Sequence, residues 1–333
     1  MYETAFHTKD ITDKKFLITG GAGFIGSNIV QYLLTHNAAM VRVLDNLATG
    51  NQENLKPFLK NKAFEFFEGD IRHADVCKQA CEGIDLVTHQ AAMGSVPRSI
   101  KDPLTTNDVN IGGFINMITA AKDAGVERFV YASSSSVYGD DPNLPKVEGQ
   151  TGKPLSPYAV SKVTNELYAD VFFNIYNLPV IGLRYFNVFG PNQDPSGAYA
   201  AVIPLFIDAL VNEKPAYIDG DGLQTRDFTY VENAVQANIL ALTGTNEEAF
   251  NKVYNIAVGE NFSVIKMYDT LAQIIGSDQK PEHREARVGD IRNSLADISR
   301  AENLLGYRPQ VRFEDGLQKT VEYFKERFYS TAE

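Results

Sequence analysis

Residues 15–26 read KFLITGGAGFIG, and this stretch decides the fold. The run Phe16–Thr19 is apolar and suits a buried strand. Gly20, Gly23 and Gly26 follow directly, where a helical pattern begins. A glycine at such a turn adopts backbone angles that other residues resist, and its missing Cβ lets a pyrophosphate approach the main chain. Because the N–H groups at a helix start attract phosphate oxygens, this stretch predicts a dinucleotide-binding turn.

Strand-like and helix-like segments alternate after this turn. Apolar runs at 40–46, 63–71, 85–92 and 128–136 fit further strands. Residues 107–124 carry apolar side chains at helical spacing. Strands that alternate with helices form a parallel sheet with helices on both faces. We therefore predict an α/β fold of the Rossmann type, with a doubly wound parallel sheet.

The pattern changes after Pro179. One more strand at 180–190 runs into the turn-rich PNQDPSG, and short strands then mix with helices. We expect residues 1–187 to form a dinucleotide-binding domain and residues 188–333 to form a smaller α/β lobe for the substrate. Residues 231–256 are assigned to the first domain as well, because VENAVQANILALTG carries a helical apolar stripe that could return to the sheet.

Acidic residues stand where two of these strands end. Asp45 ends the second strand, about 20 residues after the glycines, where a carboxylate can accept both hydroxyls of a ribose. The same charge would repel a 2′-phosphate, so the sequence favours NAD over NADP. Asp70 and Ile71 end the third strand, where a carboxylate can meet adenine and an apolar side chain can pack on it.

A second chemical pattern combines a tyrosine, a lysine and serines. Tyr158 and Lys162 stand four residues apart and so share one face of a helix. An ammonium group near a phenol is expected to stabilise the phenolate and to lower the pKa of the tyrosine. Such a tyrosine can take a proton from an alcohol near neutral pH. Residues 133–136 are four serines at the end of the fifth strand, and one hydroxyl near the phenol would support this transfer.

Composition excludes several other classes. Asp and Glu number 42 against 31 Lys and Arg, giving a net charge of −11, so nucleic acid and anionic membranes are not expected partners. No apolar run is long enough to span a bilayer, and residues 1–14 are expected to be a frayed polar arm without a secretory signal; the cytoplasm is therefore the expected location. Cys77 and Cys81 are predicted to be small buried apolar residues, and with only His73 nearby we predict no metal site.

These motifs resemble a known family. TGGAGFIG, DN at 45–46, GDI at 69–71, HQAA at 89–92, SSSVYG and YAVSK resemble the extended short-chain dehydrogenase/reductases. RYFNVFGP, AAVIP, DGLQTRDFTYV, YNIAVG and ARVGDIRNSLAD resemble the nucleotide-sugar branch of that family. The resemblance runs from Lys15 to about Phe328 and is greatest to UDP-hexose 4-epimerases, especially those that act on UDP-N-acetylglucosamine and UDP-N-acetylgalactosamine.

The resemblance implies which residues bind NAD and which carry the chemistry. Tyr158 would be the base and Lys162 its partner, with Ser134 as the serine and Ser135 and Ser136 as alternatives. The implied NAD-binding residues are Gly20, Gly23, Phe24, Ile25, Gly26, Asp45, Asn46, Thr49, Gly50, Asp70, Ile71, Gln90, Ala91, Ala92, Asn107, Tyr158 and Lys162.

The resemblance also implies a UDP-sugar site. Arg226 and Arg287 would hold the diphosphate, because guanidinium pairs bidentately with phosphate oxygens, and Tyr217 would lie against uracil. The full implied set is Gly94, Ser95, Ser134, Ser135, Ser136, Tyr158, Asn187, Gln193, Ala201, Val202, Tyr217, Arg226, Arg287, Asp290 and Ser294.

Two departures from relatives narrow the expected reaction. Dehydratases of this family carry Thr-Asp-Glu where this chain has serines 134–136, so we do not expect 4,6-dehydration. Ser294 stands where some glucose and galactose epimerases have a bulky tyrosine, and Gly94 replaces a lysine of some relatives. Small residues at both positions would leave room for a 2-acetamido group.

Other functions remain open at this point. A UDP-glucuronate decarboxylase or 4-epimerase would need a cation near the sugar carboxylate, for which Arg98 and Arg292 are the candidates. A non-catalytic NAD-binding sensor is also compatible with such a fold. A sensor has no need of a catalytic base, so the pair Tyr158 and Lys162 argues against it.

The family often pairs two helices of each subunit in a four-helix bundle, so a homodimer is expected from the resemblance. The candidates are residues 107–124 and the helix that carries Tyr158, which ends near Asn177. The alternative is that the apolar residues of this helix pack only on their own sheet. These residues are Leu167, Val171, Phe172, Phe173 and Ile175.

Overall fold

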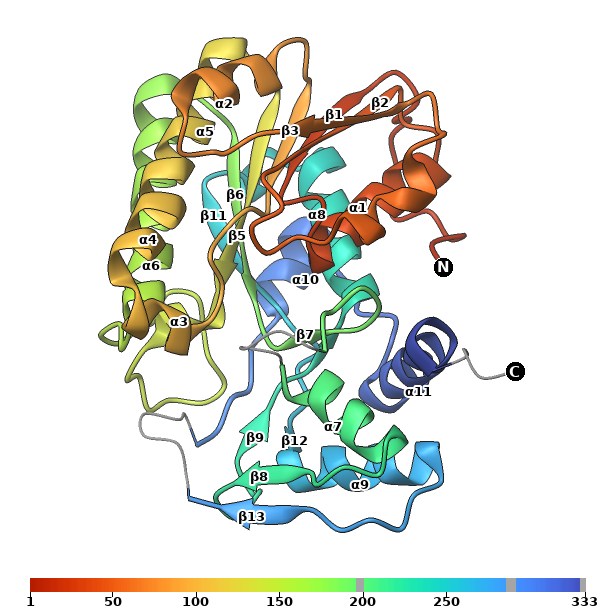
Figure 1. The fold of residues 1–333 in the computed structure, drawn as a ribbon. Coiled ribbons are helices and arrows are strands. Elements are labelled where there is room, and N and C mark those ends of the chain that lie inside the picture. The colour runs from red at the N-terminus through yellow and green to blue at the C-terminus, as the bar shows by residue number, and fades with distance from the viewer. Residues whose placement is uncertain (196–200, 286–291, 330–333) are drawn as a thin grey trace.

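The computed structural model describes residues 1–195, 201–285 and 292–329. Within these residues, seven parallel strands form one sheet in the order β11-β6-β5-β4-β1-β2-β3 (Figure 1). This sheet confirms the predicted doubly wound fold of the Rossmann type. The strands are β1 (Lys15–Thr19), β2 (Met40–Asp45), β3 (Phe64–Glu68), β4 (Leu86–His89), β5 (Arg128–Ser134), β6 (Val180–Tyr185) and β11 (Lys252–Ile256).

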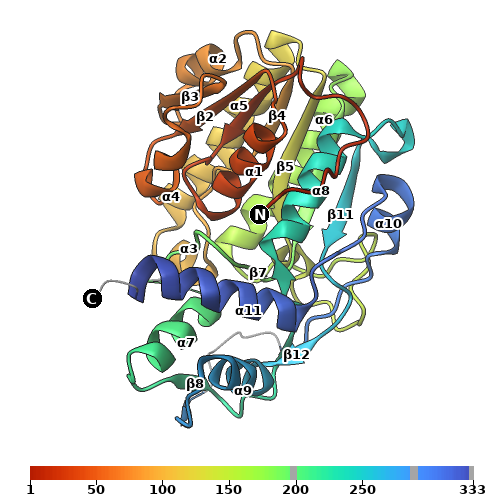
Figure 2. The ribbon, with the colours of Figure 1, turned by 90° about the vertical axis from the view of Figure 1, so that its right-hand side faces the viewer.

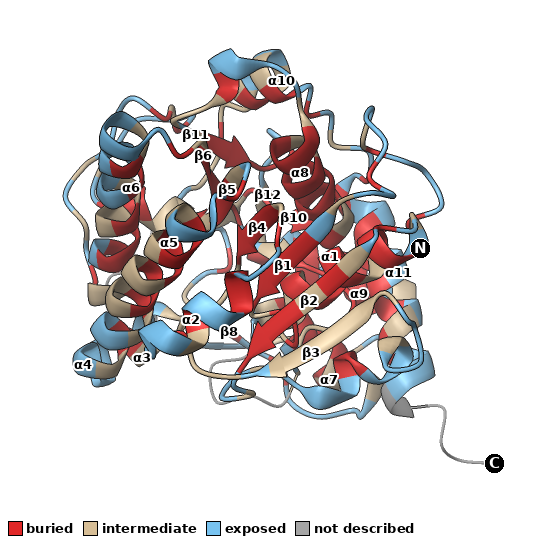
Figure 3. Cartoon of the chain, turned by 90° about the horizontal axis from the view of Figure 1, so that it is seen from above, coloured by how far each residue is buried: buried red, intermediate tan, exposed pale blue. Residues whose placement is uncertain are grey.

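Helices cover both faces of this sheet, as the view from above shows (Figure 3). The helices on one face are α2 (Ala74–Cys81), α5 (Gly113–Ala124) and α6 (Pro157–Tyr176), with the short α3 (Val96–Lys101), α4 (Pro103–Asn107) and the π-turn Asp108–Gly112 beside them. The helices on the other face are α1 (Phe24–Thr35), α8 (Val231–Thr243) and α10 (Ser299–Leu305). Each face has its own apolar core, so the inner strands are buried on both sides, whereas the edge strand β3 is only partly buried.

A smaller group of elements lies beyond the carboxyl edge of the sheet (Figures 1 and 2). Its helices are α7 (Val202–Val211), α9 (Val264–Ile275) and α11 (Phe313–Phe324). Its strand pairs are β7 (Val188–Phe189) with β10 (Thr229–Tyr230), β8 (Tyr217–Asp219) with β13 (Glu282–Arg284), and β9 (Thr225–Arg226) with β12 (Phe262–Ser263). These elements enclose a separate core around Phe189, Phe228 and Phe313.

The N-terminal arm differs from the prediction. Tyr2, Phe6 and Ile11 are buried, and Phe6 stacks on Tyr32 of α1 with ring centres 5.1 Å apart. The hydroxyl of Tyr2 donates to Oδ1 of Asn28 at 2.8 Å. The prediction of a frayed arm is therefore wrong. These three apolar residues are irregularly spaced and show no helical or strand period, yet all three belong to the apolar core on the α1 side of the sheet. The arm runs past α1 and α8 (Figure 2).

Two further observations concern the predicted exclusions. Cys77 and Cys81 are free and buried within α2. In the described parts of the chain, no helix is both long enough and apolar enough to cross a membrane.

Candidate functional site

A cavity of about 710 Å³ lies at the carboxyl edge of the sheet, where ligands bind in doubly wound folds. It gathers every residue predicted to bind NAD except Asn107. The predicted NAD-binding residues that line it are Gly20, Gly23, Phe24, Ile25, Gly26, Asp45, Asn46, Thr49, Gly50, Asp70, Ile71, Gln90, Ala91, Ala92, Tyr158 and Lys162.

The glycine turn is shaped by close backbone contacts. Gly20 has a φ of +69°, and a Cβ there would lie 2.7 Å from the backbone nitrogen of Ala91. A Cβ at Gly26 would overlap the carbonyl oxygen of Gly20. Gly23 precedes α1 in an extended conformation, and no side chain caps the first N–H groups of the helix. The turn therefore presents backbone donors and no side chain toward the cavity, as a pyrophosphate requires.

Asp45 is fixed at the end of β2 by the backbone. Its Oδ2 accepts a hydrogen bond from the nitrogen of Ala22 at 2.9 Å, and its Oδ1 accepts one from Leu47 at 2.8 Å. Burial raises the pKa of this carboxyl group, and the two hydrogen bonds lower it. A Cβ at Gly50 would lie only 3.0 Å from Oδ1 of Asp45, so a glycine at this position leaves the carboxylate accessible from the cavity. The arrangement fits a diol such as a ribose.

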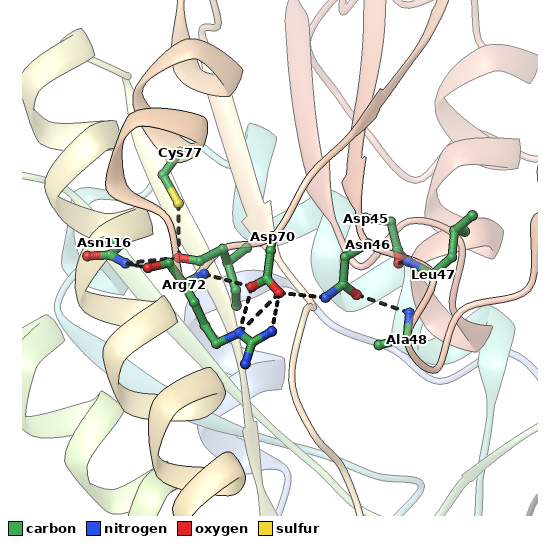
Figure 4. A network of polar contacts seen from close by, with 9 residues as sticks. Asp45, Asn46, Leu47, Ala48, Asp70, Arg72, Cys77 and Asn116 are labelled. Atoms are coloured by element: carbon green, nitrogen blue, oxygen red, sulfur yellow. Dashed lines mark hydrogen bonds and ion pairs between the residues drawn. The ribbon is translucent and has the colours of Figure 1, made fainter.

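Asp70 belongs to a polar network beside Asp45 (Figure 4). Asn46 donates to Oδ2 of Asp70 at 2.9 Å, and Nη2 of Arg72 pairs with the same oxygen at 2.6 Å. The hydrogen bond from Arg72 holds the pKa of Asp70 well below its usual range. Sequence reasoning missed Arg72, although it directly follows the GDI motif. The glycine turn and both carboxylates fit an NAD molecule.

Asn107 lies outside this cavity. It is exposed, whereas Thr105 and Val109 line the cavity, because residues two positions apart on a helix point to nearly opposite sides. The buried asparagine is Asn110, three residues later. Its Oδ1 accepts from the nitrogen of Met93 at 2.7 Å, and its Nδ2 donates to Oγ of Ser161 at 3.1 Å. Asn110 therefore connects the cavity wall to α6.

Tyr158 lies in the first turn of α6. The helix begins after Ser156, whose Oγ accepts from the nitrogen of Ala159 at 3.1 Å, and Pro157 occupies its first position. This start places Tyr158 and Lys162 one turn apart on the face that lines the cavity. Both side chains therefore reach the same space.

The electrostatics of this pair differ from the prediction. Burial raises the pKa of Tyr158, and a hydrogen bond with Ser134 lowers it. Lys162 donates to the carbonyl oxygen of Ala132 at 2.8 Å and lies 5.8 Å from the centre of the Tyr158 ring. Burial lowers the pKa of Lys162 to about 8. The predicted lowering of the tyrosine pKa by lysine is therefore not seen, because exclusion of water favours the neutral phenol.

The four serines point in different directions. Ser133, Ser134 and Ser135 all line the cavity, and Ser134 is the one hydrogen-bonded to Tyr158. Ser133 donates instead to Oε1 of Glu166 at 2.5 Å. Oγ of Ser136 is buried, has no hydrogen-bond partner among the described residues and does not line the cavity. Strand alternation followed by a 3₁₀ turn thus separates Ser134 from Ser136, which the sequence left open.

A second cavity of about 590 Å³ adjoins the first and shares Asn187, Val188 and Ala201 with it. Arg284 lines this cavity and lies over the ring of Tyr217, 5.5 Å from its centre. Sequence reasoning missed Arg284, which β13 brings beside β8. The predicted substrate residues that line only this second cavity are Val202, Tyr217 and Arg226, and those that line the first are Gly94, Ser95, Ser134, Ser135, Tyr158, Asn187, Gln193 and Ala201.

The remaining predicted substrate residues, apart from Ser136 described above, are Arg287, Asp290 and Ser294. Arg287 and Asp290 lie outside the described residues. Ser294 lines neither cavity, and its nitrogen donates to the carbonyl oxygen of Thr225, beside Arg226, at 3.1 Å.

The two candidate cations for a sugar carboxylate are placed differently. Arg98 lines the first cavity near Gly94 and Ser95. Arg292 pairs with Asp221 at 2.8 Å and lines neither cavity.

Comparison with known proteins agrees with this site. The sequence profile of the NAD dependent epimerase/dehydratase family matches residues 16–257. A UDP-glucose 4-epimerase of Mycolicibacterium smegmatis is 37% identical over 313 residues, which cover 93% of this chain and 98% of that protein.

Solved structures of similar proteins superpose over nearly the whole chain. One is a UDP-N-acetylglucosamine 4-epimerase from Methanobrevibacter ruminantium M1 in complex with UDP-N-acetylmuramic acid, with 39% identity, a TM-score of 0.88 and coverage of 94% of this chain and 99% of that one. Another is a UDP-glucose 4-epimerase from Thermotoga maritima with UDP-glucose, with 35% identity, a TM-score of 0.88 and the same coverage. Since the matched region contains the glycine turn, the strand-end carboxylates and the pair Tyr158 and Lys162, this chain belongs to the NAD dependent epimerase/dehydratase family.

Proposed function

We propose that this enzyme interconverts UDP-N-acetylglucosamine and UDP-N-acetylgalactosamine by inverting the sugar at C4, with UDP-glucose and UDP-galactose as secondary substrates. The observation that carries the proposal is the junction of the two cavities. The first is lined by the residues predicted to bind NAD together with Tyr158 and Ser134, and the second is lined by Tyr217 and Arg226. A nucleotide in the second cavity would place its sugar at Tyr158.

The residues around the sugar suit proton transfer and reorientation. Tyr158, bonded to Ser134, would take the proton of the 4-hydroxyl and later return it. NAD, when bound, supplies a hydride acceptor at C4 and gives the hydride back, so the net redox change is zero. Arg226 would hold the diphosphate while small residues such as Gly94 leave the 4-keto sugar room to turn about its diphosphate bond and present its other face.

The serine turn supports epimerisation over dehydration. Expulsion of water requires an acid at the sugar, and dehydratases of this family supply a carboxylic pair there. Here Ser134 and Ser135 face the cavity and carry hydroxyl groups only. A hydroxyl group is far too weak an acid at neutral pH to protonate a leaving hydroxide, so the 4-keto sugar is returned to a hexose.

A second candidate is epimerisation or decarboxylation of UDP-glucuronate. Arg98 supports it, because this cation lines the cavity near Gly94 and Ser95, where the sugar would lie. Arg292 gives no such support, since it pairs with Asp221. A side-by-side comparison of acetamido, neutral and uronic UDP-sugars separates these reactions.

The first prediction concerns turnover. Purified enzyme is expected to convert UDP-N-acetylglucosamine into UDP-N-acetylgalactosamine without added reductant, with a higher kcat/KM than for UDP-glucose or UDP-glucuronate. Chromatography of the products and mass analysis of the released cofactor provide the measurement. A higher kcat/KM for UDP-glucuronate, or released CO₂, would favour the second candidate; no turnover of any UDP-sugar would revive the sensor hypothesis.

We further propose residues 1–187 with 231–256 as the NAD-binding unit, residues 188–333 as the UDP-sugar lobe, and a homodimer. The helices α3, α4 and α6 expose apolar side chains: Ile100 is 63% exposed, Leu104 77%, Leu167 63% and Ile175 64%. Of the other α6 residues named above, Val171 is exposed, whereas Phe172 and Phe173 pack on their own core. A second copy would cover this face.

Charge on this face is expected to separate the subunits. The double variant Leu167→Glu and Ile175→Glu should be monomeric at concentrations where the wild type is dimeric, because each interface would bury unpaired carboxylates. Analytical ultracentrifugation measures the mass. Leu223→Glu is the control, because Leu223 is 57% exposed on the other lobe. This variant should remain dimeric. A monomeric wild type at tens of micromolar would contradict the proposal.

A further inference from the structure

A buried ionic cluster lies behind the cavity, and the proposed mechanism does not use it. Glu166 is its centre. Arg184 donates from Nε to Oε1 at 2.9 Å and from Nη2 to Oε2 at 2.8 Å, a bidentate pair. Ser133 donates to the same Oε1 at 2.5 Å. The side chains of Arg184 and Glu166 are 4% and 15% exposed. Loss of one partner would leave the other charge buried without compensation.

This cluster joins the elements that carry the catalytic residues. Glu166 lies one helical turn beyond Lys162 on α6. Ser133 directly precedes Ser134 at the end of β5, and it stands opposite Arg184 in the register of β5 and β6. One carboxylate therefore ties the strand end that presents Ser134 to the helix that presents Lys162.

The charges around Lys162 give Glu166 a second role. Tyr158 and Glu166 stand one turn before and one turn after the lysine on α6, His89 on β4 is close enough for the lysine charge to lower its pKa, and Arg184 on β6 pairs with Glu166. The negative charge of Glu166 raises the pKa of Lys162 against the larger effect of burial. His89 is buried, and burial together with the lysine charge lowers its pKa to about 3, so it stays neutral. Glu166 is thus the carboxylate that favours the ammonium form.

We propose that Glu166 is a positioning residue for the catalytic pair: held by Arg184 and Ser133, it fixes the strand end that carries Ser134 and places a carboxylate one helical turn from Lys162. The inference rests on the proposed function, which gives Ser134 and Lys162 their roles. Glu166 itself does not line the cavity, so it acts through these two residues.

The test is a direct titration of Lys162. In protein with ¹³C-labelled lysine Cε, the Lys162 resonance is assigned as the one missing from Lys162→Met. Glu166→Gln keeps the shape of the side chain and removes its charge, so the pKa of Lys162 should fall by roughly one unit. The alkaline decline of kcat should move to lower pH by the same amount, because a neutral amine is reached sooner.

Glu148→Gln is the matched control. The Glu148 side chain is 3% exposed, and its Oε1 accepts from the nitrogen of Asn255 at 3.0 Å. Its backbone carbonyl accepts from Arg184, a contact that the substitution keeps, and its carboxylate does not act on the pKa of Lys162. This variant should lose stability and leave the Lys162 titration unchanged. Equal Lys162 pKa values in wild type, Glu166→Gln and Glu148→Gln would overturn the proposal.

Two milder variants separate the two roles and remain informative if Glu166→Gln does not fold. Glu166→Asp keeps a carboxylate for Arg184, but the shorter side chain no longer reaches the hydroxyl of Ser133. We therefore expect kcat to fall several-fold while the pKa of Lys162 stays unchanged. Ser133→Ala should do the same. A shifted titration in Ser133→Ala, or full activity in both variants, would contradict the assigned roles. If no UDP-sugar is turned over, the proposed function fails, whereas the titration still decides the charge role of Glu166.

Discussion

Tyr158→Phe is expected to lower kcat about 10³-fold and to leave the bound NAD in place. The substitution removes one hydroxyl and keeps the ring that lines the cavity. Without that hydroxyl the 4-hydroxyl of the sugar has no base, since Ser134 is a far weaker one and Lys162 donates to Ala132. The measurement is the rate of UDP-N-acetylglucosamine conversion together with the NAD content of the purified protein.

Tyr254→Phe is the matched control for this variant. Tyr254 is also buried, lies on β11 outside both cavities, and donates to the carbonyl oxygen of Ala249 at 2.7 Å. Loss of that hydrogen bond should cost about 1 kcal/mol of stability and leave kcat unchanged. Activity within tenfold of the wild type in Tyr158→Phe would exclude this residue as the base and would make the pair with Lys162 a structural feature.

The features predictable from sequence are those that depend on local geometry. The glycines at 20, 23 and 26 follow a strand by chain connectivity alone, and a turn of that kind admits few conformations. Asp45 and Asp70 are each recognisable as the carboxylate at the end of an apolar run, where ligands bind in a doubly wound fold. Tyr158 and Lys162 needed only the helical period. None of these inferences required knowledge of which segments pair across the fold.

The structure differs from the sequence predictions where the side of a helix on which a residue lies decides its surroundings. The family resemblance implies that Asn107 binds NAD, yet Asn107 is exposed and the buried asparagine is Asn110. Asn107 faces away from Thr105, which lines the cavity, and Asn110 lies in the π-turn Asp108–Gly112 that follows, which no residue pattern reveals. The prediction for the N-terminal arm was wrong for a related reason. Tyr2 and Phe6 pack on α1, but their spacing in the sequence shows neither a helical nor a strand period.

Contacts between segments that are far apart in the chain also could not be predicted from the sequence. Arg284 meets Tyr217 only because β13 pairs with β8, two strands of three residues each that carry little pattern. The bond between Ser133 and Glu166 depends on how α6 lies against β5, and the charge of Lys162 depends on the same packing. Burial reversed the expected effect on the pKa of Tyr158, since the sequence gives the neighbours of a group and not its exposure to water.

The glycine turn gives the second large prediction. Gly26→Ala is expected to abolish NAD retention and to destabilise the protein by about 1–3 kcal/mol. The new methyl group would overlap the carbonyl oxygen of Gly20 and lie 2.8 Å from the Cα of Gly21. Both are backbone atoms of the turn itself, so no side chain can move aside. The turn must open, and the N–H groups that face the pyrophosphate lose their alignment.

Gly112→Ala provides the control, because a Cβ at Gly112 would meet nothing within 4 Å and its backbone is helical. It should match the wild type or be slightly more stable. Cofactor release on denaturation gives the NAD content, and thermal unfolding with and without added NAD measures the coupling. Because a ligand that binds only the folded state raises Tm, NAD should raise the Tm of the wild type and of Gly112→Ala but not that of Gly26→Ala. An equal rise in all three would show that the phosphates do not sit on this turn, and the assignment of the cavity to NAD would then have to rest on the carboxylates Asp45 and Asp70.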